Sequence, residues 1–219
     1  MNFEVFKLVL ERNESKMYEI FADLHVHIGR SESGKPIKIT AARTLNFANI
    51  AKECESRKGI QVVGIIDCAS PYVIEDIEKF LENGDAYELK NGGIIYKDKV
   101  CILLGSEVET SEKGRNGKCG SAHNVCFFPY LKDIKGFSEE MSHHIKNITL
   151  STQRSDLSGY DLIDIVEKYN GILIPAHVFT PFKSYYGNCT DRMKDIFKEK
   201  YDKIFAVELG LSSDTYLAD

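Results

Sequence analysis

The stretches YEIFADLHVH (residues 18–27) and VVGIID (residues 62–67) decide the fold expected for this chain. Both are short apolar runs of the kind that form strands. Between them, residues 45–57 carry apolar side chains at helical spacing and stop before Gly59, a residue suited to a helix C-terminus. A strand, a helix and a second strand in this order predict a parallel βα unit.

The same alternation continues along the chain. Ser70 and Pro71 predict a helix N-cap followed by a proline in the first turn, and Ser158 with Asp161 matches a capping box in form. The other expected elements are a hairpin over 93–106 that turns at Lys97 and Asp98, a mobile glycine-rich loop over 109–121, strands at 125–128, 172–176 and 204–209, and helices after Ser138 and at 191–200. This order predicts an α/β fold built from parallel units.

The composition excludes several classes of protein. The 219 residues are 43% apolar and 28% charged, which predicts one globular domain over residues 1–219 rather than a disordered, fibrous or coiled-coil chain. No apolar run is long enough to cross a membrane, and the first residues lack the pattern of a secretory signal. The net charge of −5 argues against a strong non-specific grip on nucleic acid by this segment alone.

The cysteines indicate a reducing compartment. The six lie at positions 54, 68, 101, 119, 126 and 189, none forms a CxxC motif, and several fall inside apolar runs. This usage is typical of reduced, core-packing thiols, so we expect a cytoplasmic protein without disulfides.

Residues able to bind a metal follow several predicted strands. They are His25 and His27 in DLHVH, Asp67 in GIID, Glu107 in LLGSE and His177 in IPAH, with His123 beside the strand NVCFF. In a parallel α/β fold the carboxyl ends of the strands meet at one rim, so these side chains are expected to converge there. Residues two apart on a strand share a face, which places His25 beside His27.

Each residue taken alone also has a structural interpretation. A His-x-His pair is often solvent-facing, Asp67 could cap the helix after it, and His177 could be a hydrogen-bonded core histidine. A single acid after a strand, such as Glu107, is usually a solvated loop residue. The conjunction of four histidines and two acids at strand ends favours a metal site over independent accidents.

The donor types indicate which ions would bind. Histidine combined with carboxylate suits Zn, Mn or Fe better than Mg or Ca. Five or six ligands exceed what one catalytic zinc needs, so we expect two or three divalent ions. Glu107 is the natural bridge, because each of its oxygens can take one ion, and two adjacent ions suit phosphoryl displacement by an activated water.

The order DLHVH, GIID, LLGSE, His123 and IPAH resembles the PHP superfamily of metal-dependent phosphoesterases, and more specifically the endonuclease Q family. The supporting segments are ADLHVHIGR (22–30), KGIQVVGIID (58–67), LLGSEVE (103–109), IPAHVFTPFKSYYG (174–187) and VELGLSSD (207–214). The resemblance implies a distorted (β/α)7 TIM-like barrel, metal ligation by His25, His27, Glu107, His123 and His177, and catalysis by His25, His27, Glu107 and His177. It also implies cleavage of DNA on the 5′ side of uracil, hypoxanthine or abasic sites by a metal-activated water.

The sequence departs from the superfamily pattern at three places. Cys68 follows Asp67 where a histidine is usual, and Ile28-Gly29-Arg30 follows His27 without the usual aspartate. The chain also reaches Asp219 without the terminal Asp-x-His pair. We therefore expect a C-terminally incomplete barrel that lacks a further zinc-binding and helical region, with weak or no activity for this chain alone.

We expect most of the residues that contact the substrate to lie in the loop that follows His177. Aromatics alternate there with a lysine and hydroxyls, which suits base stacking and phosphate contact, although a self-packed loop has the same composition. The predicted substrate contacts are Arg154, Thr180, Lys183, Ser184 and Tyr186, with 113–118 as a further phosphate-binding loop.

Three functions remain open from the sequence. The first is a DNA repair endonuclease whose partner is damaged single- or double-stranded DNA. The second is a small-molecule phosphatase of the histidinol-phosphatase type, acting on a small phosphoester. The third is a non-catalytic, metal-poor binding remnant, which Cys68 and the missing terminal histidine favour.

Overall fold

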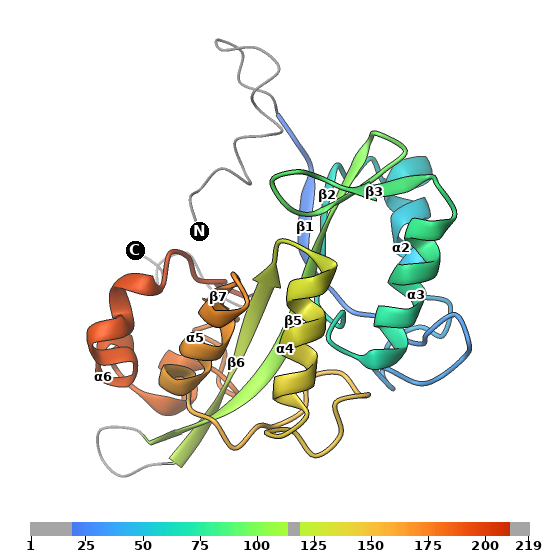
Figure 1. The fold of residues 1–219 in the computed structure, drawn as a ribbon. Coiled ribbons are helices and arrows are strands. Elements are labelled where there is room, and N and C mark those ends of the chain that lie inside the picture. The colour runs from blue at the N-terminus through green and yellow to red at the C-terminus, as the bar shows by residue number, and fades with distance from the viewer. Residues whose placement is uncertain (1–18, 114–118, 211–219) are drawn as a thin grey trace.

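The computed structural model describes residues 19–113 and 119–210, which form a mixed α/β fold (Figure 1). Its strands are β1 (Ala22–Val26), β2 (Val62–Ile65), β3 (Ala86–Glu88), β4 (Ile94–Tyr96), β5 (Val100–Lys113), β6 (Cys119–Phe128) and β7 (Ile172–Pro175). Its α-helices are α2 (Phe47–Glu53), α3 (Pro71–Glu82), α4 (Leu131–Met141), α5 (Gly159–Lys168) and α6 (Met193–Phe197). Shorter helical turns span Cys54–Lys58, Tyr185–Cys189 and Lys198–Lys203.

The expected local signals are present in the first βα units. Gly59 ends the helical segment with a φ of 64°, and Pro71 opens α3 after the N-cap Ser70. The Ser70 hydroxyl makes no cap hydrogen bond and donates instead to the carbonyl of Thr149. The Ser158 side chain accepts the Asp161 N–H at the start of α5, as the capping box predicted.

The long strand β5 organises a seven-stranded sheet. Its first half lies between β2, which is parallel to it, and β4, which is antiparallel, and β1 adds to β2 in parallel. Its second half pairs antiparallel with β6 over ten residue pairs, from Leu104↔Phe128 to Lys113↔Cys119. Because β7 is antiparallel to β6, it runs in the same direction as β1, β2 and β5.

The two faces of this sheet have different environments. Along β6, Cys126 and Phe128 point into the large core that also contains the buried side chains of α2, α3, α4 and α5. Val125 and Phe127 alternate with them and therefore face the other side, where they form a small cluster with Ile66 and Ala176. The helices thus cover one face, and Figure 1 shows α4 and α5 lying over β5 and β6.

The sheet of the described residues is open rather than closed. The mixed α/β class is as predicted, but strands β1 and β7 do not pair with each other, so a TIM-like barrel is not seen within residues 19–113 and 119–210. In that same range, no helix is long and apolar enough to cross a bilayer.

Several sequence-based boundaries were wrong. Residues 109–113 and 119–121 belong to the β5–β6 ladder rather than to a loop, because each of them pairs with a residue of the other strand. Helix α4 begins at Leu131 and includes Ser138, whereas the sequence predicted a helix that starts after Ser138. Residues 204–209 form no strand, although Glu208 exchanges backbone hydrogen bonds with Pro175 and Val178 beside β7.

The Phe127 ring packs directly over Gly105, where an added Cβ would lie 2.9 Å from Cε1 of the ring. Gly105→Ala is therefore expected to destabilise the protein by about 1–3 kcal/mol through overpacking. In a Phe127→Leu background the same substitution should cost less, because the ring that meets the new methyl group is gone. Urea unfolding of the four proteins in this cycle measures the coupling, and equal costs in both backgrounds would contradict the packing argument.

Candidate metal centre

Four imidazoles surround the carboxylate of Glu107. Glu107 lies in β5 opposite Val125, on the face of the sheet that the helices leave uncovered. Its side chain is only 2% exposed. The imidazoles come from three separate segments of the chain, and they belong to His25, His27, His123 and His177.

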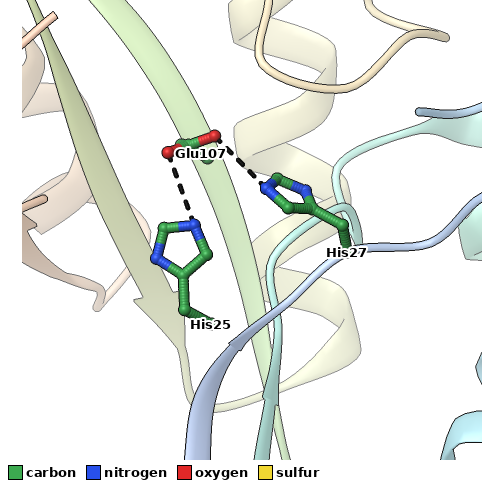
Figure 2. Close-up of side chains that lie close together, drawn as sticks. All are labelled: His25, His27 and Glu107. Carbon is green, nitrogen blue, oxygen red and sulfur yellow. Dashed lines mark ion pairs between the residues drawn. The ribbon is translucent and has the colours of Figure 1, made fainter. Parts of the chain in front are cut away.

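His25 and His27 approach Glu107 from β1 and the loop after it (Figure 2). Nε2 of His25 lies 3.5 Å from Oε1 of Glu107, and Nε2 of His27 lies 3.6 Å from Oε2. Figure 2 shows both rings directed at the carboxylate. One atom from each of the three residues falls within 4.8 Å of the others, so they can share one ion.

His123 and His177 form a second group with the same carboxylate. Nδ1 of His123 lies 3.0 Å from Oε1 of Glu107 and 3.2 Å from Nε2 of His177. Nε2 of His177 is 3.6 Å from Oε1 of Glu107, so these three residues can also share an ion. Glu107 belongs to both groups, and its predicted role as a bridge between two ions stays a prediction.

The other ring nitrogen of each histidine faces an oxygen of a neighbouring residue. Nδ1 of His25 is 3.0 Å from Glu208, Nδ1 of His27 is 3.1 Å from Asp67, Nε2 of His123 is 3.6 Å from Glu109 and Nδ1 of His177 is 3.1 Å from Thr180. Hydrogen-bond partners of this kind select the tautomer and fix the rings of His25, His27 and His177, leaving the inner nitrogen to bind a metal. Nε2 of His123 is buried without a hydrogen-bond partner, because Glu109 is too far away. His177 also adopts a φ of 34°, which is uncommon outside glycine and typical of functional sites.

The charges of the centre are strongly coupled. Burial opposes ionisation of Glu107, but hydrogen bonds from His123, His177 and His25 outweigh it and hold the pKa of Glu107 far below its usual range. Burial also opposes protonation of His25, yet Glu107 and Glu208 raise the pKa of His25 to about 9. A protonated imidazole cannot donate to a metal, so metal binding at His25 has to displace this proton.

The residues fit divalent ions. Imidazole nitrogens and one shared carboxylate form the donor set typical of Zn, Mn or Fe sites. The inner nitrogens of His123 and His177 lie 3.2 Å apart, which is close enough for both to bind one ion together with Glu107. Oδ1 of Asp67 is buried without a hydrogen-bond partner beside this set, which leaves a further oxygen available to an ion.

Asp67 lies behind His27 rather than among the two groups. Its Oδ2 accepts from the His27 ring and from the Ile28 N–H at 2.7 Å, so it orients this histidine. Its predicted role as a direct ligand stays a prediction. Cys68, at the departure from the superfamily pattern, is fully buried in the large core with its thiol directed at the Ile65 carbonyl, so it offers the centre no sulfur.

The predicted substrate residues differ in how far they are exposed to solvent near the centre. Arg154 and Lys183 both pair with Glu109, at 2.5 Å and 2.8 Å, and half or more of each side chain is exposed. The Thr180 hydroxyl contacts His177, Tyr186 stacks on Phe179, and the Ser184 hydroxyl is buried as the cap of the following turn. Of the predicted loop 113–118, residues 114–118 lie outside the described residues.

The sequence analysis did not predict four residues that lie beside the candidate ligands, namely Glu109, Thr152, Lys38 and Glu208. Burial of Glu109 is outweighed by Lys183 and Arg154, which lower the pKa of Glu109 to about 2. Thr152 donates to Oε2 of Glu107 at 2.6 Å, and Lys38 donates to Nε2 of His27 at 2.5 Å. Only Glu109 and Glu208 had a signal in the sequence, since both lie in segments that resemble the endonuclease Q family.

Comparison with known proteins gives relatives of greater length. The chain is 45% identical to the uncharacterized protein YqxK of Bacillus subtilis over 204 residues, which are 92% of this chain and 51% of YqxK. It is 26% identical over 160 residues to the uncharacterized protein MJ0043 of Methanocaldococcus jannaschii, covering 73% of this chain and 16% of that protein. No family model matches the chain.

The structure is similar to the lesion-specific endonuclease Q of Pyrococcus furiosus, with a TM-score of 0.71 and 25% identity over 91% of this chain and 44% of that chain. The chain is a structural relative of endonuclease Q. A solved complex of endonuclease Q with a 27-mer duplex that has an abasic lesion at the active site is equally similar, with a TM-score of 0.71 and 26% identity over 91% of this chain and 45% of that chain. The part of this chain that resembles endonuclease Q includes both groups of residues that could hold a metal ion.

Glu107→Gln tests the bridging role. The amide keeps the shape but removes the charge shared by both ligand groups, so we expect loss of all tightly bound Mn²⁺. Asp67→Asn should keep the stoichiometry and weaken affinity by about 10- to 100-fold, as removal of an orienting partner does. Calorimetric titration measures both, with Glu139→Gln on the exposed face of α4 as the control. Unchanged binding by Glu107→Gln would contradict the assignment.

Proposed function

We propose that the protein is a metal-dependent phosphodiesterase that cleaves DNA on the 5′ side of deaminated bases or abasic sites. The observation that carries the proposal is the convergence of His25, His27, His123 and His177 on the single carboxylate of Glu107. The likeness to endonuclease Q, a lesion-specific endonuclease, supplies the substrate class.

The metal centre suits an in-line displacement at phosphorus. Two or three divalent ions, Zn, Mn or Fe, would supply an activated water and positive charge for the phosphate oxygens. His25 and His27 would hold one ion and His123 and His177 a second, with Glu107 between them. Glu208, Asp67 and Thr180 contact the outer nitrogens of His25, His27 and His177, so that each of these rings keeps one fixed orientation.

A positively charged and aromatic loop borders the centre on the side of His177. Lys183 and Arg154 are held by Glu109 with their side chains open to solvent, where they suit contacts with DNA phosphates. Phe182, between Thr180 and Lys183, is 78% exposed and suits stacking on a base. Tyr186 supports this loop by stacking on Phe179 at a centroid distance of 5.2 Å. The Thr180 hydroxyl orients His177, and the Ser184 hydroxyl is turned inward.

The chain spans about half the length of the first relatives that it matches. We propose that residues 1–219 belong to a metal-binding PHP-type domain, and that the open sheet is part of a distorted barrel. The uncovered sheet face with Val125, Phe127 and Glu107 would then be the barrel interior, which is where the centre lies.

A nicking assay tests the proposed reaction. The intact protein with saturating Mn²⁺ is expected to cut a duplex that contains one uracil, hypoxanthine or abasic site, leaving the break 5′ of the lesion. Glu107→Gln should reduce the rate by about 100-fold or more, because it removes a residue common to both ligand groups. Gel analysis of an end-labelled strand measures the position and the rate of cutting.

Two controls separate the alternatives. An undamaged duplex of the same sequence tests lesion dependence, and p-nitrophenyl phosphate tests the small-molecule phosphatase. Turnover of the monoester without DNA cutting would replace the endonuclease proposal. If the protein binds Mn²⁺ but neither cuts DNA nor hydrolyses the monoester, both enzymatic functions are contradicted and the non-catalytic binding remnant is favoured.

A further inference from the structure

Lys38 is the one cationic side chain of the described residues that is hydrogen-bonded directly to a histidine of the metal centre. Its Nζ donates to Nε2 of His27 at 2.5 Å. This ring nitrogen is the same atom that faces Glu107 and would bind an ion. Lys38 therefore occupies the space next to the first ligand group, although lysine was not among the residues expected there.

The backbone around Lys38 holds it at this place. The Lys38 N–H donates to the carbonyl of Ile28, and the Ile37 N–H donates to Gly29, each at 3.0 Å. Ile37 is 1% exposed, and its carbonyl accepts from Ser151. The segment is thus tied both to the chain that follows His27 and to the core, so Lys38 is directed at the centre by fixed structure.

The hydrogen bond of Lys38 and the binding of a metal are mutually exclusive. Nδ1 of His27 is already engaged by Asp67, so Nε2 is the atom left for an ion. One ring nitrogen has one lone pair and cannot serve both the ammonium and the metal. When an ion takes Nε2, the half-buried ammonium of Lys38 loses its partner.

An ammonium in that position needs a new acceptor, because an unpaired charge away from bulk water is costly. Among the described residues, no carboxylate oxygen lies within ion-pair distance of Lys38, and Glu107 and Asp67 act on its charge only from farther away. Lys183, on the other side of the centre, is paired directly with Glu109. A phosphate brings several anionic oxygens to the mouth of the centre. It would meet Lys38 next to the ion, at a distance that a lysine side chain can span.

We propose that Lys38 is a substrate-binding residue that contacts a non-bridging oxygen of the phosphate being cleaved. The inference rests on the proposed phosphodiesterase function and deepens it by naming a residue that recognises the phosphate. A positive charge beside the ions would bind the phosphate and offset the charge that develops in the transition state.

The test uses inorganic phosphate as the probe, with the intact protein at saturating Mn²⁺. Lys38→Met keeps the packed stem of the side chain and removes the charge. We expect phosphate affinity to fall by about 10- to 100-fold, as loss of a hydrogen bond to a charged group does. Lys38→Arg should recover most of the affinity. Lys35→Met, in the same loop but exposed and placed over the Tyr72 ring, should match the parent protein.

Metal content and DNA cutting are measured on the same samples. Phosphate affinity of Lys38→Met equal to that of Lys35→Met would overturn the inference. Loss of Mn²⁺ from Lys38→Met at saturating metal would also overturn it, because Lys38 would then only support the centre. If the parent protein binds phosphate through Lys38 but cuts no lesion-containing DNA, Lys38 remains a phosphate-binding residue and the proposed endonuclease function fails.

Discussion

The structure depends on one buried carboxylate with four imidazoles around it. Glu107 is 5% exposed, and burial of a lone anion at such a place would be strongly unfavourable. It is tolerated because His25, His123 and His177 contact one of its oxygens, while His27 and Thr152 lie at the other. The same arrangement places Glu107 in both groups of residues that could hold a metal ion, so the fold of this sheet also positions the candidate metal centre.

The antiparallel hairpin of β5 and β6 is what makes the arrangement possible. Parallel strands alone bring their ends to one rim, but His123 lies inside β6, opposite Glu109, and reaches the centre from the reverse direction. The alternation of side chains along both strands puts Glu107, Glu109 and His123 on the face without helices. Residues on the other face, such as Val108 and Ala122, fill the large core and hold the hairpin in register.

Residues that contact the candidate ligands connect them to other parts of the surface and of the chain. Glu109 faces His123 and also holds Arg154 and Lys183, so one buried carboxylate connects a ligand to two exposed cations. Glu208 reaches His25 and the His177 N–H from a segment with no regular secondary structure. Likeness to endonuclease Q gives these features a context, while Cys68 in the core marks where this chain differs from the wider superfamily pattern.

The sequence by itself determined the donor types, the strands that carry them and the likeness to endonuclease Q. His-x-His on β1 and Glu107 on β5 were predictable because strand periodicity and residue chemistry are local properties. The tertiary structure alone decided the antiparallel course of β6, the ring nitrogen that each histidine directs at Glu107, and the approach of Lys38 and Thr152. These depend on strand order and loop paths, which are set by packing between distant segments and leave no periodic signal in the chain.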